Sequence, residues 1–397
     1  MKSDLTSFME LICTRQLICF GAGNYFERAY KELSCYGIEI TACIDNNKAL
    51  WGSSLHGIPV YSVEWLEEQE LSNFIILIAN ADHYEEMAMQ VKTFGVSEKQ
   101  IYRYPLNGRF SNPEKKFWEN RLKVSCRERY EYIHTKEEVD HKVAQMEKDN
   151  LFVIPRIPVM LTTRCTLRCE QCSNLMPYYE RPRDYAASDV LGWIQAILDV
   201  VDEWICIELV GGEPFLYKEL ETVLQFVLTC EKIKHVEFTT NATIIPKENI
   251  LSLLQNDKVS VHISDYGKIV SNQKFIDVME EYRIKYVLYK EMKWVAVGGV
   301  EPRGRSEEEQ RAQYWACPAA KMCKTVLNGK LYACSRAASL HQLGIEPKME
   351  YIELVDNANL QEELKEFLLL NNSIACDYCD NAIEKLTFVE AAVQKKR

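Results

Sequence analysis

Apolar runs alternate with amphipathic stretches along most of the chain. Residues 17–20 form an apolar run that ends in the glycine turn at 21–23, and residues 24–33 then have apolar positions three and four apart. Apolar runs at 38–44 and 74–79 follow, with another amphipathic stretch over 82–95. Buried strands separated by amphipathic helices are typical of a parallel sheet covered by helices. The pattern therefore predicts an N-terminal doubly wound α/β domain, over residues 1–107.

A polar, charged segment with helical periodicity follows, and residues 108–150 are predicted to be a helical connector. The strand and helix alternation then returns. Strands are predicted at 153–163, 204–212, 235–243, 258–265 and 283–290, with helical runs such as 189–204 between them. Five strands at this spacing favour a full or partial parallel α/β barrel over residues 151–310. Residues 311–397 are predicted to form a small cysteine-rich extension with a β-hairpin.

Composition and charge narrow the classes of function. The 397 residues are 47% hydrophobic, which is typical of a packed globular protein. A net charge of −11 argues against a general binder of nucleic acid or of membrane surfaces. Charged residues at Asp4, Glu10 and Arg15 interrupt the N-terminus, and no apolar run approaches the length of a membrane span. We therefore expect a cytoplasmic protein whose thiols stay reduced.

The chain contains 15 cysteines, and their placement is more informative than their number. Seven lie apart in mostly apolar surroundings and are interpreted as small core residues: Cys13, Cys19, Cys35, Cys43, Cys126, Cys206 and Cys230. The other eight fall into two groups, one at 165–172 and one at 317–379. Clustered cysteines in a reducing compartment are candidate metal ligands.

The first group is Cys165, Cys169 and Cys172, which follow directly after the predicted strand at 153–163. The carboxyl end of a strand is where a parallel barrel carries its chemistry. Three thiolates on one loop can each bind one iron of a cubane cluster, and they leave the fourth iron open to a small molecule. A zinc knuckle is the alternative, because closely spaced cysteines also bind zinc.

The spacing of Cys165, Cys169 and Cys172 resembles the cysteine motif of the radical S-adenosylmethionine (SAM) superfamily. The resemblance implies a partial (β/α)6 TIM-type barrel and a [4Fe–4S] cluster whose open iron chelates SAM. It also implies that one electron from the cluster cleaves SAM to a 5′-deoxyadenosyl radical.

Polar residues at the ends of the later strands extend this resemblance. It implies SAM contacts at the following positions: Gly211, Gly212, Glu213, Thr240, Asn241, Ser264 and Asp265. The Gly-Gly-Glu element would bind the methionine amine, since a carboxylate is a natural partner for an ammonium. Gln171 departs from the family pattern, which commonly has an aromatic residue there. His262 lies among apolar neighbours and is interpreted as a core histidine rather than a ligand.

The second group surrounds Asn328-Gly329, a strong hairpin signal between two apolar runs. Its arrangement resembles the auxiliary-cluster extension called SPASM, and more closely the shortened form called twitch. The resemblance implies a second [4Fe–4S] cluster on Cys317, Cys334, Cys376 and Cys379, with Cys323 spare or replacing Cys317. Four protein ligands would close the cluster and suit it to electron transfer, whereas three would leave an iron open to substrate. A structural zinc ribbon is the alternative.

The N-terminal turn carries Gly21 and Gly23, and Asp45 ends the next predicted strand. This matches part of the dinucleotide-binding fingerprint, although Phe26 stands where its third glycine would be. The segment resembles Rossmann-like domains attached to enzymes of bacterial surface-sugar biosynthesis. Two interpretations remain open: the segment holds a site for a nucleotide or nucleotide sugar, or it is a docking domain that binds no ligand.

These features together predict a radical SAM oxidoreductase. The radical would take a hydrogen atom from a carbon of a sugar-like or nucleotide-linked small molecule, and the auxiliary cluster would accept the substrate's electron. A flavodoxin or ferredoxin would supply the electron that cleaves SAM. Arg303, Arg305 and Tyr314 are the polar residues to test for catalysis. A peptide maturase, a radical epimerase and a zinc-stabilised binding module are the alternatives.

Overall fold

The computed structural model describes residues 8, 11–12, 15–35, 38–80, 83–104, 115–267, 269–290, 293–317, 324–381 and 387–395. Side chains at 35, 115–121, 315 and 316 are outside this description. The chain divides into two compact units, Met1–Val124 and Ser125–Arg397, and each is considered by itself. Cys323 and Cys13 lie outside the described residues, and the four-domain division expected from the sequence stays a prediction.

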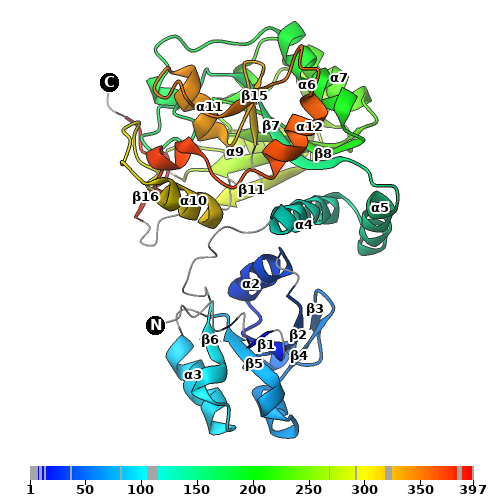
Figure 1. The fold of residues 1–397 in the computed structure, drawn as a ribbon. Coiled ribbons are helices and arrows are strands. Elements are labelled where there is room, and N and C mark those ends of the chain that lie inside the picture. Colours follow the sequence, from blue (N-terminus) through cyan, green and yellow to red (C-terminus); the bar gives the residue numbers. More distant parts are fainter. Residues whose placement is uncertain are drawn as a thin grey trace. The chain divides into compact units, whose positions relative to one another are not determined.

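The first unit is a parallel α/β sheet (Figure 1). Its elements are β1 (Gln16–Phe20), α2 (Asn24–Cys35), β2 (Ile40–Ile44), β3 (Ser54–Leu55), β4 (Ile58–Tyr61), β5 (Phe74–Ile78), α3 (Tyr84–Thr93) and β6 (Ile101–Arg103). The strand order is β3-β4-β2-β1-β5-β6, and only β3 is antiparallel to its neighbour. Counting the parallel strands alone, this is the doubly wound order 3-2-1-4-5.

The apolar run of β1 is continuous because both faces of this sheet are buried. Leu17 and Cys19 belong to one hydrophobic cluster, while Ile18 and Phe20 belong to the cluster on the other side. Successive side chains of a strand point to opposite faces, so every residue of a two-sided strand must be apolar. The strands and helices predicted for this unit are thereby confirmed.

The rest of the chain alternates in the same way before ending in short strands. Its elements are α4 (Lys115–Ile133), α5 (Lys136–Lys148), β7 (Val153–Thr162), α6 (Ala187–Val200), β8 (Glu203–Gly211), α7 (Leu220–Thr229), β9 (Ile233–Thr240), α8 (Glu248–Leu254), β10 (Val259–Asp265), α9 (Gln273–Glu281), β11 (Tyr286–Lys290), β12 (Lys293–Val295), α10 (Glu307–Ala316), β13 (Thr325–Leu327), β14 (Lys330–Tyr332), α11 (Ser335–Gln342), β15 (Tyr351–Glu353), α12 (Leu360–Leu368) and β16 (Phe388–Glu390). The α/β class with parallel sheets is confirmed.

One eight-stranded sheet carries both the barrel strands and the hairpin, in the order β11-β10-β9-β8-β7-β13-β14-β15. The sheet is open, with β11 and β15 at its two edges. The hairpin β13–β14 turns at Asn328 and Gly329, whose φ angles of 51° and 76° are those of a tight hairpin turn. Val326 of β13 pairs in parallel with Val159 of β7, so the C-terminal hairpin continues the sheet that holds the first cysteine loop.

A buried ion-pair network ties α4 to the strands β7, β8 and β9. The Glu237 carboxylate is only 1% exposed and accepts from Arg156 at 2.6 Å and from Arg129 of α4 at 3.4 Å. Arg156 also pairs with Glu208 at 2.7 Å. His262 of β10 is buried and bonds to the Tyr132 hydroxyl at 2.9 Å, which fits a core histidine. Burial lowers the pKa of His262 to about 4, so its ring is neutral near pH 7.

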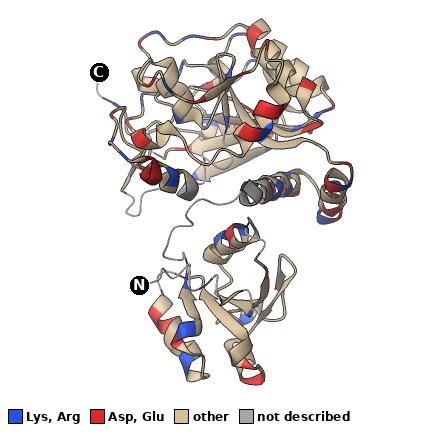
Figure 2. Ribbon diagram, in the orientation of Figure 1, with Lys and Arg blue, Asp and Glu red and all other residues tan. Residues whose placement is uncertain are grey.

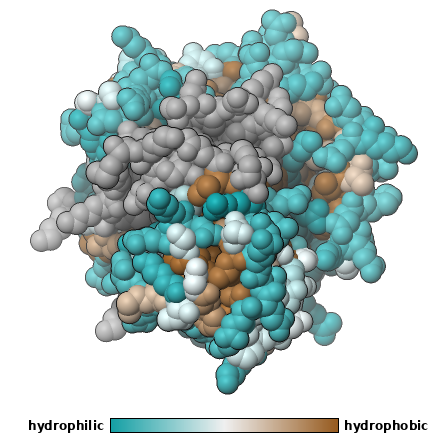
Figure 3. Space-filling model, turned by 60° about the horizontal axis from the view of Figure 1, so that its bottom comes forward, coloured by the Kyte–Doolittle hydropathy of each residue, from teal (hydrophilic) through white to brown (hydrophobic). Residues whose placement is uncertain are grey.

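Charged residues of both signs share the surface helices, as Figure 2 shows along α3 and α5. The face drawn in Figure 3 is mainly hydrophilic, with hydrophobic atoms showing in small separate areas. Among the described residues, every helix is too short or too polar to cross a bilayer.

Candidate functional site

The loop after β7 holds the first cysteine group in a fixed backbone. The Cys172 amide donates to the Cys169 carbonyl at 3.3 Å, and the Thr163 amide donates to Arg183 at 2.9 Å. Burial, with a smaller contribution from negative charge on neighbouring thiols, raises the pKa of Cys165 to about 12 and that of Cys169 to about 11. The three thiols therefore influence one another electrostatically, and each needs a positive partner to become a thiolate.

Amide donors are already directed at two of these sulfurs. The Asn241 side chain donates to Cys165 Sγ at 3.6 Å, and the Leu167 amide donates to the same atom at 3.4 Å. The Gln394 side chain donates to Cys169 Sγ at 3.4 Å. N–H groups that face a sulfur stabilise its thiolate form, which is the form that binds iron.

Three neighbouring thiols with amide donors fit a cubane cluster, which binds each thiolate through a different iron. The donor set thus suits a cluster with one iron left without a protein ligand.

Gly211 and Gly212 let the end of β8 pass against the cysteine loop. A Cβ on Gly211 would lie 2.3 Å from the Thr162 carbonyl oxygen, and one on Gly212 would lie 2.2 Å from the Arg164 carbonyl oxygen. The same backbones are hydrogen-bonded, since the Gly212 amide donates to Thr162 at 2.9 Å. Only glycine fits at both positions, and the pair fixes where Cys165 begins its loop.

Glu213 follows β8 directly and is hydrogen-bonded to the end of β9. Its carboxylate is fully buried and accepts from the Thr240 hydroxyl at 2.8 Å, the Asn241 amide at 3.0 Å and the Phe215 amide at 3.2 Å. Burial raises its pKa to about 7, although these three donors oppose the shift. The side chain therefore has structural partners already, which the sequence did not indicate.

The other strand-end residues lie on the same edge of the sheet. Asn241 also donates to the Thr166 hydroxyl at 3.2 Å and so reaches the cysteine loop directly. Asp265 accepts from the Gly267 amide at 2.9 Å, and Ser264 accepts through its carbonyl from Asn272 at 3.3 Å. The order β7-β8-β9-β10 places these residues at successive carboxyl ends, where a parallel sheet binds ligands.

The C-terminal segment around Gln394 is a part of the site that sequence reasoning missed. Gln394 accepts from the Arg168 amide at 2.7 Å, and the Glu170 amide donates to the Val393 carbonyl at 2.8 Å. The segment therefore pairs with the first cysteine loop across more than 220 residues of sequence. No local pattern signals such a contact, because it depends only on how the chain folds back.

The second group gathers four cysteines from separate elements. Cys317 follows α10, Cys334 follows β14, and Cys376 and Cys379 lie in and just after a short 3-10 helix, Ile374–Tyr378. Burial, with a smaller contribution from negative charge on Cys379 and Cys317, raises the pKa of Cys334 to about 12. The pKa of Cys376 is raised by burial and then by the same neighbouring thiols. The structure thus brings together the four cysteines expected to share a cluster.

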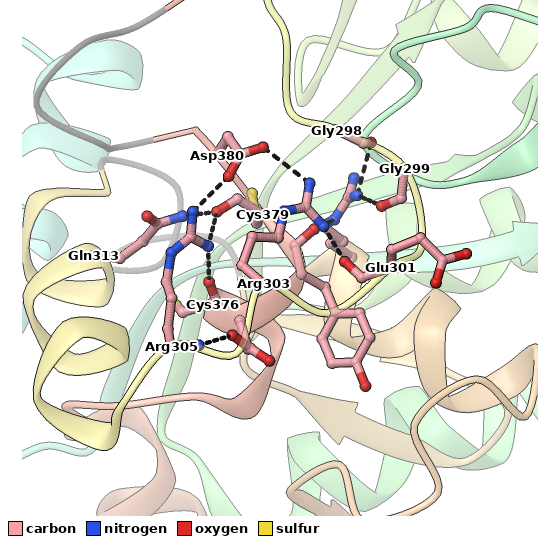
Figure 4. Close-up of polar contacts among 12 residues, drawn as sticks. Gly298, Gly299, Glu301, Arg303, Arg305, Gln313, Cys376, Cys379 and Asp380 are labelled. Atoms are coloured by element: carbon pink, nitrogen blue, oxygen red, sulfur yellow. Dashed lines mark hydrogen bonds and ion pairs between the residues drawn. The ribbon is translucent and has the colours of Figure 1, made fainter.

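Arg303 and Arg305 contact the loop that carries Cys376 and Cys379 (Figure 4). Arg305 donates to the carbonyls of Cys376 and Cys379 at 2.6 and 2.8 Å. Both arginines pair with Asp380, and their charges lower the pKa of its carboxyl against the effect of burial. Tyr314 is buried beside the same thiols and bonded to Lys324. These contacts give all three residues a role in shaping the loop.

The first unit contains a cavity of about 750 Å³ at the carboxyl ends of β1, β2 and β5. Gly21, Gly23 and Asp45, the residues of the partial fingerprint, all line it. The Asp45 carboxylate accepts from the Ala22 amide at 2.6 Å and from the Asn47 amide at 2.7 Å, so it fixes the glycine turn. The cavity lies where the strand order reverses between β1 and β5, which is the usual ligand position in such sheets.

A loop of three thiols at a strand end of a parallel α/β sheet is a candidate iron–sulfur site. Comparison with family models is more specific. Residues 159–280 match the model described as Radical SAM superfamily, and residues 13–102 match the model described as C2185-like, N-terminal. Residues 159–280 therefore form a radical SAM domain, which indicates an enzyme with a [4Fe–4S] cluster and SAM as its cofactors.

Individual relatives are more distant. GTP 3′,8-cyclase of Aquifex aeolicus (strain VF5) is 30% identical over 129 residues, which is 30% of this chain and 38% of that protein. The same enzyme of Stenotrophomonas maltophilia (strain R551-3) is 31% identical over 96 residues, 23% of this chain and 28% of that protein. The chain thus spans well under half the length of these curated relatives.

Solved structures of similar fold include BtrN in complex with AdoMet and 2-DOIA, at 15% identity and a TM-score of 0.37, covering 58% of this chain and 98% of that one. Streptococcus suis SuiB bound to S-adenosylmethionine has 16% identity and a TM-score of 0.28, covering 53% and 45%.

Proposed function

We propose that this enzyme oxidises a carbon of a sugar-like or nucleotide-linked substrate and passes the electron to a second [4Fe–4S] cluster. Bound at the first cysteine loop, the cluster and SAM supply a 5′-deoxyadenosyl radical that takes a hydrogen atom from the substrate. An external donor such as flavodoxin or ferredoxin provides the starting electron. The chain's own residues bind both clusters and orient the substrate between them.

The set of four cysteines at Cys317, Cys334, Cys376 and Cys379 is the observation that carries this proposal. Four thiolates occupy every iron of a cubane cluster, so substrate has no open iron to bind. A closed cluster is suited to accept the one electron that the substrate radical gives up after hydrogen abstraction, while a base takes the hydroxyl proton and so completes the two-electron oxidation. The loop bonds from Arg305 hold Cys376 and Cys379 in place for this role.

We propose that SAM lies along the strand ends that contact the first loop. Asn241 reaches both Cys165 and Thr166, and it follows directly after Thr240 at the end of β9. The side chain of Glu213 is engaged with β9, so its part in binding SAM would be to set the position of Thr240 and Asn241. Ser264 and Asp265 supply polar groups at the next strand end.

Two cysteine variants separate the proposed roles of the groups. Cys169→Ala removes a ligand of the first cluster and should abolish SAM cleavage, measured as 5′-deoxyadenosine by chromatography under anaerobic conditions. Cys376→Ala should leave SAM cleavage intact and stop the formation of product two mass units lighter than substrate. Cys230→Ala, a cysteine outside both groups, is the control and should change neither readout. Full product formation by Cys376→Ala would refute the electron-acceptor role.

Metal analysis of the wild-type chain tests the foundation of the proposal. Two cubane clusters correspond to about eight irons and eight sulfides per chain, and one cluster to about four of each. Zinc in place of iron and sulfide at the second group would refute the oxidation mechanism. A product of unchanged mass that gains one deuterium in deuterated water would instead identify an epimerase.

We propose in addition that the N-terminal cavity binds a nucleotide or a nucleotide sugar. The proposal is supported by the cavity, which is lined by the glycine turn 21–23 and by the start of α2. The N-terminal end of a helix favours a phosphate group. The residues Asn46, Asn80 and Gln90 add neutral hydrogen-bonding groups to the lining.

Gly23→Leu tests this second proposal, because a Cβ at Gly23 meets no atom within 4 Å and the side chain can enter the cavity. Calorimetric titration of the full chain with a uridine diphosphate sugar should give binding that Gly23→Leu weakens at least tenfold. Glu64→Gln, an exposed position of the same unit, is the control. Binding unaffected by Gly23→Leu would place the nucleotide elsewhere.

A further inference from the structure

Arg336 is a buried arginine that lies just after Cys334, at the start of α11. It is 3% exposed, and its guanidinium donates to three backbone carbonyls. Nε donates to Tyr378 at 3.0 Å, and Nη2 donates to Gly298 at 2.9 Å and also to Gly299. Its Nη1 is buried and has no hydrogen-bond partner among the described residues. A buried charged donor without a partner is costly unless something else satisfies it.

The three carbonyls connect Arg336 to both cysteine loops. Tyr378 lies between Cys376 and Cys379 in the second group. The Gly298 amide donates to the Gln171 side-chain oxygen at 3.0 Å, and Gln171 precedes Cys172 in the first group. One continuous path of hydrogen bonds therefore runs from the first loop through Gln171, Gly298 and Arg336 to the second loop. It also assigns a contact to Gln171, the residue that departs from the family pattern.

The charge of Arg336 acts on thiols of both groups. Arg336 interacts electrostatically with Cys172 of the first group and with Cys379 and Cys334 of the second. Guanidinium groups stay protonated in proteins, so this side chain is a fixed positive charge.

Other charges near the second loop do not cancel Arg336. Arg303 and Arg305 share the Asp380 carboxylate, and Asp377 of the same loop accepts from the Arg305 amide, so the formal charges of these four side chains sum to zero. Within the described residues, Arg336 itself forms no ion pair with a carboxylate, and its known partners are all backbone carbonyls. A cubane with four thiolate ligands carries net negative charge, which increases when the cluster accepts an electron.

We propose that Arg336 is the positioning and charge-balancing residue of the second cluster, and that its positive charge favours the reduced state of that cluster. The proposal rests on the proposed function, because it requires a cluster at Cys334, Cys376 and Cys379. The free Nη1 donor supplies the hydrogen bond, and the carbonyl contacts hold the guanidinium in place. The electron leaving the substrate radical is thereby accepted more readily.

The test is a redox titration of the full chain followed by electron paramagnetic resonance. A Cys169→Ala background removes the signal of the first cluster. Arg336→Gln should reduce the equilibrium constant for one-electron reduction of the second cluster at least tenfold, which lowers its midpoint potential by at least 59 mV. Arg336→Lys keeps the charge and should change the constant less than tenfold. Arg311→Gln, a residue paired with Glu307 on α10, should leave it unchanged.

Each outcome decides a different point. An unchanged potential in Arg336→Gln, with the second cluster fully loaded, would overturn the role of Arg336 alone. If Arg336→Gln does not fold, Arg336→Lys still tests the proposal. A tenfold or larger decrease in the equilibrium constant for reduction in Arg336→Lys would show that the positive charge does not determine the potential of the second cluster. Absence of a second cluster from the wild-type chain would instead refute the proposed function, and the present inference with it.

Discussion

Replacing Gly212 with alanine should destabilise the second unit, Ser125–Arg397, and displace its first cysteine loop. The added Cβ would lie 2.2 Å from the Arg164 carbonyl oxygen and 2.8 Å from the Cys165 Cβ, whereas ordinary contacts begin at 3.4 Å. The two backbones must therefore separate by about 1 Å. Neither atom belongs to a flexible side-chain end, so local rearrangement cannot absorb the methyl group.

The cost follows from two terms. Forcing a methyl group into a packed site costs about 1–3 kcal/mol. The separation also weakens the bond from the Glu213 amide to Arg164, now 2.8 Å, which contributes about 0.5–1.5 kcal/mol. We expect Gly212→Ala to lower the free energy of unfolding by about 2–4 kcal/mol. After reconstitution, the variant should contain about four irons fewer than wild type, because Cys165 is displaced from Cys169 and Cys172.

Gly192→Ala is the matched control. Gly192 lies inside α6 of the same unit, and a Cβ there would meet no atom within 4 Å. Alanine favours a helix interior over glycine by about 1 kcal/mol, so this variant should be slightly more stable than wild type. Urea unfolding followed by circular dichroism measures both changes. Equal midpoints for Gly212→Ala and wild type, with full iron content, would refute the close-approach argument.

Three further predictions concern buried charges. Burial holds the pKa of Glu213 near 7, so the free energy of unfolding should fall by on the order of 3 kcal/mol as pH rises from about 4.5 to about 7. Glu213→Gln should remove this loss, which urea unfolding of the apoprotein at pH 5 and pH 8 measures. Glu237→Ala leaves Arg129 and Arg156 without their shared carboxylate and should cost about 3–5 kcal/mol, against under about 0.5 kcal/mol for the exposed Glu231→Ala. Arg305→Met should release about four irons from the second group while SAM cleavage persists; retention of all the iron would contradict its role in the loop.

Local patterns were sufficient to predict the elements that carry the site. The strands β7 to β11 and the hairpin at Asn328-Gly329 follow from apolar periodicity and from a turn that needs positive φ, both of which depend on adjacent residues. The cysteine triplet was recognisable for the same reason, since its three ligands lie within eight residues. Strand ends of a parallel sheet share one edge, so Thr240 and Asn241 could be placed near the triplet before the fold was known.

The tertiary structure decided how these parts are joined. The sequence pattern predicted a separate C-terminal extension, while the fold adds β13 to β7 in one sheet. Gln394 donates to Cys169, and Arg336 links Gly298 to Tyr378, across long stretches of chain. Such contacts carry no local signal, because they depend on packing and not on the spacing of neighbouring residues. The sequence by itself thus determined which cysteines are candidate iron ligands, and the fold determined which side chains contact their loops.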